Sequence, residues 1–285
     1  MGENKLVGDM AYEKIGTLSL DYKPCRYGGS KLLFRGPKRK LTGNYVAFIG
    51  GTETYGKFIE APFPDLIEQQ TGVTCVNFGW PNAGVDVFLN ERAILDACEG
   101  AQAVVLQLPC AQNMTNRFYS VHPRRNDRFV GPSNLMKSVF RDIDFTEFHF
   151  TRHMLNNLKA MAPERFNMIR DELQSAWVAR MKLLLNRIDN RVILLWFSAR
   201  HPGEGNNSAD LAKDPAFVTR AMLDAVRGRA AAVVKVCASP LVKAQGTAGM
   251  VFSELEANAA AELLGPMAHE EAAKALVPII KKTLA

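Results

Sequence analysis

Five short runs of apolar residues recur along the chain, separated by longer stretches of mixed character. The runs cover residues 45–50, 73–79, 101–108, 191–199 and 231–239. Within each run the apolar residues follow one another instead of alternating with polar ones, which is typical of parallel strands covered on both faces. The pattern predicts an α/β fold, a three-layer sandwich around a central five-stranded parallel sheet of the flavodoxin-like kind.

The stretches between the runs carry apolar residues at helical spacing. In the clearest one, residues 163–189, Pro163 stands at a first-turn position and apolar side chains recur every three or four residues along one stripe. Residues 214–229 and 268–285 repeat this pattern. In a sheet built this way, ligands bind in the crevice at the carboxyl ends of the strands, so we expect the functional turns there.

The chain divides into two predicted parts. Residues 1–43 show no sustained period, and we expect them to form an N-terminal arm. Residues 44–285 predict one α/β domain, which agrees with a total length of 285 residues. The segment at about 110–162, between the third and fourth strands, predicts a helical insertion with two helices that covers the crevice as a cap.

Composition narrows the classes of function. A hydrophobic share of 47% is ordinary for a globular protein. The five cysteines show no paired spacing, so we expect no disulfides, no metal site and a reducing, cytoplasmic location. We also expect no cofactor. No apolar run approaches the roughly 20 residues of a membrane helix. The net charge of +6 is spread along the chain, so we expect a small-molecule substrate and no nucleic-acid partner. A homo-oligomer is a possible partner arrangement that the sequence does not decide.

The first predicted strand runs into a glycine-rich turn at residues 50–57, Gly-Gly-Thr-Glu-Thr-Tyr-Gly-Lys. The glycine spacing before Lys57 resembles a phosphate-binding P-loop, but Phe58 stands where Ser or Thr would hold magnesium. The third strand carries Gln107 instead of a metal-holding aspartate. No G-x-G-x-x-G fingerprint follows any of the strands. The sequence therefore argues against a nucleoside triphosphate or dinucleotide site.

Four short blocks, in order, resemble those of the SGNH or GDSL-like hydrolase superfamily. A Gly-Gly-Thr block ending at Thr52 stands where that superfamily has Gly-Asp-Ser. Gly79 matches its block-two glycine, Asn113 its asparagine, and His269 its histidine before the last helix. The resemblance implies an esterase or acyltransferase, with Thr52 as nucleophile, His269 as base, and Gly79 and Asn113 as oxyanion donors.

Two positions depart from the superfamily pattern. Thr52 carries an extra methyl group that crowds an attacking hydroxyl, and Pro266 stands where the superfamily has the aspartate that orients the histidine. A carboxylate partner for His269 then has to come from elsewhere in the chain. The candidates are Glu53, Asp86, Asp127 and Glu262. These departures leave a catalytically inactive SGNH-like binding module as an alternative.

The densest polar cluster covers residues 116–129, in which arginines alternate with aromatic residues. Arginine binds carboxylate, phosphate or sulfate through two parallel hydrogen bonds, so we expect an anionic substrate group here, although arginines that only hold the insertion in place would explain the cluster equally. The expected substrate-binding residues are Gly51, Glu53, Thr54, Lys57, Arg117, Arg124, Arg125 and Arg128. A further alternative is a phosphate- or sulfate-handling transferase, with the turn at 50–57 and the arginine cluster as anion cradle.

Two histidines in the predicted insertion have metal-ligand spacing. His149 and His153 lie four positions apart, which places them on one face if the segment is helical. No third ligand follows from the spacing, so we expect these histidines to pack beside neighbouring phenylalanines instead.

Overall fold

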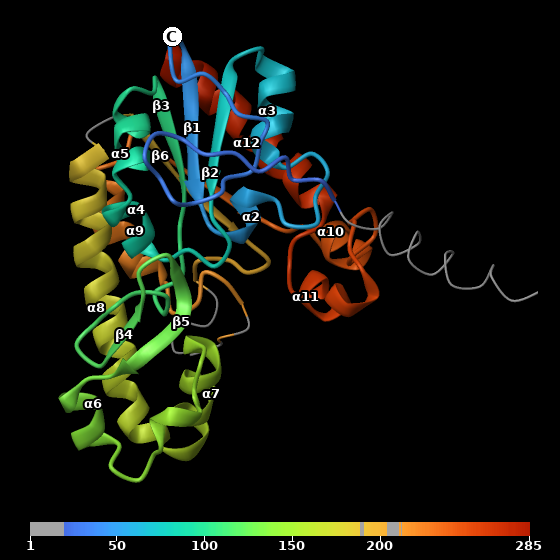
Figure 1. The fold of residues 1–285 in the computed structure, drawn as a ribbon. Helices are drawn as coiled ribbons and strands as arrows, with labels where there is room; N and C mark the ends of the chain where they lie inside the picture. Colours follow the sequence, from blue (N-terminus) through green and yellow to red (C-terminus); the bar gives the residue numbers. More distant parts are fainter. Residues whose placement is uncertain (1–19, 189–190, 204–210, 212) are drawn as a thin grey trace, which may run out of the picture.

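All five apolar runs form strands of one parallel sheet in the computed structural model, which describes residues 20–188, 191–203, 211 and 213–285 (Figure 1). The strands are β1 (Tyr45–Gly50), β2 (Thr74–Gly79), β3 (Ala103–Gln107), β6 (Val192–Ser198) and β7 (Ala232–Cys237). Their order across the sheet is β2-β1-β3-β6-β7, and every neighbouring pair is parallel. The α/β fold class predicted from the sequence is confirmed.

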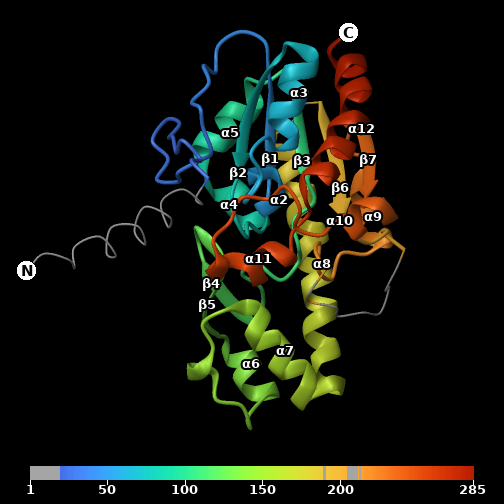
Figure 2. The same ribbon diagram turned by 90° about the vertical axis from the view of Figure 1, so that its right-hand side faces the viewer.

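Helices cover both faces of the sheet, which explains why its strands are apolar without interruption (Figure 2). One face packs on α3 (Phe63–Thr71) and α12 (Pro266–Leu284), and the other on α4 (Val85–Asn90), α5 (Arg92–Glu99), α8 (Pro163–Ile188) and α9 (Arg220–Arg227). Alternate residues of β1 enter different cores. Val46 and Phe48 pack toward α3 and α12, whereas Ala47 and Ile49 belong to the core on the other face.

The strand order reverses direction at β1, which creates a switch point. From β1 the chain first passes to β2 on one side and then crosses to β3 on the other. In such sheets the ligand crevice opens outside the carboxyl ends of the strands at the switch point. Here these ends carry the short helix α2 (Thr52–Tyr55) after β1 and Gln107 at the end of β3.

The insertion between β3 and β6 lies beyond the carboxyl edge of the sheet, and α8 runs from the sheet to it (Figure 1). It contains α6 (Asn134–Val139), the 3₁₀ helix η1 (Phe145–Glu147) and α7 (Thr151–Met161). It also contains an antiparallel hairpin of β4 (Tyr119–His122) and β5 (Arg125–Pro132), which the helical prediction did not include. The hairpin escapes a pattern analysis because β4 has only four residues and irregular register.

Two further segments complete the described part of the chain. From residue 20 onward the predicted arm packs on the main domain, with Tyr27, Leu32 and Phe34 buried in its core; the part before residue 20 lies outside the described residues. Between β7 and α12 lie α10 (Pro240–Gln245), the 3₁₀ helix η2 (Glu254–Glu256) and α11 (Ala257–Ala261). Among the described helices, none is long and apolar enough to cross a membrane.

The end of β2 touches the backbone of α2 directly, which explains the glycine there. A Cβ atom on Gly79 would lie 2.2 Å from the backbone nitrogen of Tyr55 and 2.6 Å from the carbonyl carbon of Thr54. Contacts this short are forbidden, and a backbone cannot swing away as a flexible side chain can. Gly79 therefore fixes how closely the turn after β1 lies on the neighbouring strand.

We expect Gly79→Ala to lower the free energy of unfolding by about 2 kcal/mol or more, since the added methyl must displace α2. Urea denaturation of the purified variant measures this change. The matched control is Gly228→Ala, where φ is −66° and no atom lies within 4 Å of the added Cβ. A Gly79→Ala protein as stable as the control would contradict the close packing of α2 on β2.

Candidate functional site

The glycine-rich turn after β1 is closed around the side chain of Gln107. Its Oε1 atom accepts hydrogen bonds from the backbone N–H of Gly51 (3.2 Å), the N–H of Thr54 (3.0 Å) and the hydroxyl of Thr54 (2.5 Å). Thr54 is fully buried and Gln107 is 7% exposed. The donors on this side of the turn are therefore satisfied from inside the protein.

Lys57, at the end of the turn, also faces its own chain. Its Nζ atom lies 3.9 Å from a carboxylate oxygen of Glu256 and 4.6 Å from the centroid of the Phe58 ring. A phosphate or sulfate cradle would need the backbone N–H groups of Gly51 and Thr54 and the ammonium of Lys57. All three groups already have partners within the protein. An anion at this turn would have to displace them.

Thr52 points to a different partner, the exposed side chain of Asn82. The backbone N–H of Asn82 donates to the Thr52 hydroxyl oxygen (3.0 Å), and that hydroxyl donates to Oδ1 of the Asn82 side chain (3.3 Å). The Asn82 amide nitrogen in turn donates to Asp127 on β5 (3.3 Å). Asn82 has a φ of +56°, a left-handed conformation that is uncommon outside glycine. A chain of polar contacts thus links Thr52 through Asn82 to Asp127.

His269 lies in the first turn of α12 and is completely buried. Its Nδ1 accepts a hydrogen bond from the backbone N–H of Phe63 (3.2 Å), and its Nε2 lies 3.7 Å from a carboxylate oxygen of Glu53. A ring nitrogen that accepts a hydrogen bond carries no proton, so we assign the proton of the neutral ring to Nε2. The basic nitrogen of His269 is therefore directed at Phe63.

Four carboxylates were candidate partners of His269, and Glu53 is the one that lies close to its ring. The other Glu53 oxygen accepts from the backbone N–H of Leu264 (3.0 Å), which ties this side chain to the segment before α12. Among the described residues, no hydrogen bond or ion pair joins His269 to Thr52. The structure brings His269 to Glu53 and Thr52 to Asn82.

Asp86 and Glu262 are engaged elsewhere. Asp86 forms an ion pair with Arg180 (2.5 Å) and accepts from the backbone N–H of Thr115 (2.8 Å). Glu262 pairs with Arg152 at 2.8 Å. Both carboxylates hold helices or loops together.

The two expected oxyanion donors are bonded within the protein. The N–H of Gly79 donates to Asn77 Oδ1 (2.8 Å), and the Asn77 amide nitrogen donates to the carbonyl of Thr54 (2.7 Å). The amide nitrogen of Asn113 donates to the carbonyl of Asn82 (2.9 Å), and its Oδ1 accepts from the hydroxyl of Thr151 (2.9 Å). A ligand oxyanion would have to compete with these bonds.

The arginines of the hairpin region have separate surroundings. Arg117 pairs with the buried Glu172, with 2.6 Å from Nε to the carboxylate, which is a structural bond to α8. The guanidinium of Arg128 lies over the ring of Phe150 at 4.8 Å. Arg124 contributes its backbone carbonyl, which accepts from the Trp80 indole N–H (2.6 Å), and its side chain is exposed. Arg125 is the one of the four that lines a cavity at the sheet edge.

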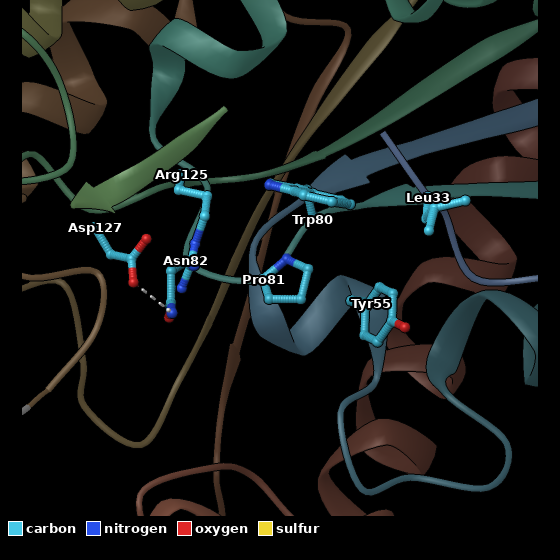
Figure 3. A pocket seen from close by; sticks show the side chains of 7 residues that line it. All are labelled: Leu33, Tyr55, Trp80, Pro81, Asn82, Arg125 and Asp127. Carbon is cyan, nitrogen blue, oxygen red and sulfur yellow. Dashed lines mark hydrogen bonds between the residues drawn. The ribbon is translucent and has the colours of Figure 1, made fainter. Parts of the chain in front are cut away.

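This cavity has a volume of about 230 Å³ and opens beside α2 (Figure 3). It is lined by Leu33, Tyr55, Trp80, Pro81, Asn82, Arg125 and Asp127. The ring side chains lie toward one side in Figure 3, and Asn82, Arg125 and Asp127 lie toward the other. Burial raises the pKa of the Tyr55 phenol, which keeps it protonated and able to donate a hydrogen bond. Leu33 comes from the arm, so this segment contributes to the cavity.

The histidine pair of the insertion does not share a helix face, which corrects the spacing argument. His149 precedes α7, whereas His153 lies within it, and both side chains are exposed. The ring of His153 packs against Phe148 with 5.2 Å between centroids. Within the described ranges, no cluster of His, Cys, Asp or Glu is suited to hold a metal ion.

The sequence analysis missed two residues that organise this edge, Asn77 and Asn82. Asn77 lies inside an apolar strand, where an isolated polar residue is a signal for a buried hydrogen-bonding role. Asn82 follows a Trp-Pro pair, where an asparagine is a signal for a turn with positive φ. Neither signal reveals which group the side chain binds.

Comparison with known proteins gives a family and several similar folds. The family model "Domain of unknown function (DUF6473)" matches residues 10–284. No curated protein matches the chain by sequence.

Similar solved structures include a carbohydrate esterase family 2 enzyme from Corynascus thermopiles (Myceliophthora fergusii), with 12% identity, a TM-score of 0.45, and 87% of this chain and 69% of that chain covered. The lipase Lip_vut3 from a goat rumen metagenome shows 10% identity and a TM-score of 0.44, with 82% of this chain and 96% of that chain covered. A candidate lipolytic protein of the G-D-S-L family from Desulfitobacterium hafniense shows 13% identity, a TM-score of 0.36 and coverage of 82% and 100%. These likenesses carry no argument about the activity of this chain.

We expect Gln107→Leu to lower the free energy of unfolding by about 2 to 4 kcal/mol, because it leaves the buried Thr54 donors without an acceptor. Urea denaturation measures the change. Gln102→Leu, at a half-buried position just before the same strand, is the control, expected within about 0.5 kcal/mol of wild type. Equal stability of the two variants would mean that Gln107 does not hold the turn.

Proposed function

The chain belongs to the DUF6473 family, and we propose that it binds a small acidic or acyl-bearing molecule at the carboxyl edge of its SGNH-like sheet without the Thr–His chemistry of an esterase. The observation that carries the proposal is the separate bonding of the two expected catalytic groups. The Thr52 hydroxyl is bonded to Asn82, and the unprotonated nitrogen of His269 is bonded to the N–H of Phe63.

A hydroxyl nucleophile at neutral pH needs a base within hydrogen-bond reach. The polar partner of Thr52 is an asparagine, whose amide cannot accept a proton at neutral pH. His269 is fully buried between Phe63 and Phe197, at 5.9 and 5.3 Å between ring centroids. Turning its basic nitrogen toward Thr52 would break this bond and leave the buried backbone N–H of Phe63 without its acceptor.

The cavity beside Thr52 offers the groups of a binding site. Trp80, Pro81 and Tyr55 supply flat apolar surface for a ring or a short chain. Arg125 supplies a guanidinium for a carboxylate or another anion, and Asn82 and Asp127 supply hydrogen bonds to hydroxyl or carbonyl groups. These groups fit a small molecule with one flat apolar face, several oxygens and one negative charge.

A second candidate is acyl transfer that starts from Thr52. It is favoured by the position of this half-exposed hydroxyl, which occupies the nucleophile position of the superfamily and touches the cavity residue Asn82. It requires a base that reaches Thr52 only after rearrangement. The phosphate- or sulfate-transferase alternative has no such support, since Gly51, Thr54 and Lys57 face internal partners.

We expect wild type, Thr52→Val and Thr52→Ser to hydrolyse p-nitrophenyl acetate and butyrate at rates equal within about twofold, because no base activates the hydroxyl. Initial rates of p-nitrophenolate release at pH 7 to 8 measure this. A loss of about a hundredfold or more in Thr52→Val, with activity kept in Thr52→Ser, would establish the second candidate instead.

We expect glucuronate to quench the tryptophan fluorescence of wild type in a saturable way. Of the three tryptophans, Trp177 and Trp196 are fully buried, so the half-exposed Trp80 reports on the cavity. Glucuronate combines a flat ring face with hydroxyls and a carboxylate, as the lining requires. Arg125→Gln should weaken binding about tenfold or more, the scale of one charged hydrogen bond, whereas the exposed Arg220→Gln on α9 should not. Equal effects of both variants would contradict the role of Arg125.

A further inference from the structure

The insertion carries a second cavity, of about 550 Å³, which shares no lining residue with the one beside Thr52. Its lining comes from residues 129–149, that is from β5, α6, η1 and the loops between them. The buried phenylalanines of the lining are Phe129, Phe140, Phe145 and Phe148. Phe145 lies 6.4 Å from Phe129 and 6.3 Å from Phe148 between ring centroids, so these three rings form one contiguous aromatic group in the lining, which we call the aromatic floor.

The rim of this cavity is cationic. Lys137 and Arg141 line it with exposed side chains, and among the described residues neither forms an ion pair. The one carboxylate of the lining, Asp144, accepts from the N–H (2.9 Å) and the hydroxyl (2.8 Å) of Thr146. These bonds lower the pKa of Asp144 and direct its charge at its own loop. The Nε atom of Arg141 donates to the backbone carbonyl of Ser138 (3.2 Å), so the other guanidinium nitrogens and the Lys137 ammonium are the groups that face a ligand in the cavity.

We propose that this cavity binds an amphipathic monocarboxylate, a molecule with an apolar chain or ring and one acidic group. The aromatic floor removes the apolar part from water, and Lys137 and Arg141 bind the carboxylate at the opening. The volume lies within the roughly 300 to 1,000 Å³ usual for small-molecule sites. This site is independent of the ligand proposed for the sheet edge.

Gly131 on β5 provides a way to close the cavity without disturbing the fold. It lines the cavity, and a Cβ atom built on it meets no atom within 4 Å. Its φ is not in the left-handed region, so a side chain causes no backbone strain. A leucine at this position adds a large apolar side chain to the lining of the cavity.

The test is isothermal titration of the full chain with octanoate and, separately, with 1-octanol. Wild type should bind octanoate at least tenfold more tightly than octanol. Lys137→Gln combined with Arg141→Gln should weaken octanoate binding at least tenfold and leave octanol unchanged. Gly131→Leu should abolish the binding of both. Trp80→Phe, in the other cavity, and Lys274→Gln, on an exposed face of α12, should bind like wild type.

Several results would overturn the proposal. Octanoate binding no tighter than octanol binding would show that the cations do not bind the carboxylate. Octanoate binding that survives in Gly131→Leu would show that the cavity is not the binding site. Light scattering adds a further criterion. A wild-type dimer that Gly131→Leu converts to monomer, with no octanoate binding in either protein, would assign the cavity to a second copy of the chain instead.

Discussion

A single side-chain oxygen, Oε1 of Gln107, holds the turn on which the candidate site is built. It accepts hydrogen bonds from two backbone amides and one hydroxyl of the turn after β1, which ties this turn to the end of β3. Because the parallel strands β1 and β3 are neighbours, this places α2 directly over the switch point of the sheet. The same closure brings the backbone of α2 onto Gly79, where a side chain has no room. The donors of the turn are thus bound by the side chain of Gln107.

The closure separates the groups that an SGNH-type site would combine. Glu53 turns toward the buried His269 and the segment before α12, whereas Thr52, one residue earlier, turns toward Asn82. Asn82 then joins β5 of the insertion through Asp127. What remains open to solvent is the face with Trp80, Asn82 and Arg125. That geometry supports binding more directly than proton transfer.

The sequence predicts the frame of this protein well and its site poorly, for one physical reason. A buried parallel strand is specified by consecutive apolar residues, so the run at 45–50 coincides with β1. Hydrogen-bond partners are not specified by residue type. Gly79 and Asn113 match an oxyanion pattern in the sequence, yet their donors are bonded to Asn77 and to the carbonyl of Asn82. These partners depend on packing between segments distant in the chain.

The most direct test of the central claim is whether Thr52 behaves as an activated nucleophile. The purified chain is incubated with an alkyl fluorophosphonate, which phosphonylates activated hydroxyls, and its intact mass is recorded over hours beside that of Thr52→Val. We predict no added mass on either protein, because an asparagine rather than a base contacts the hydroxyl. Stoichiometric labelling of wild type that maps to Thr52 and vanishes in Thr52→Val would contradict the account.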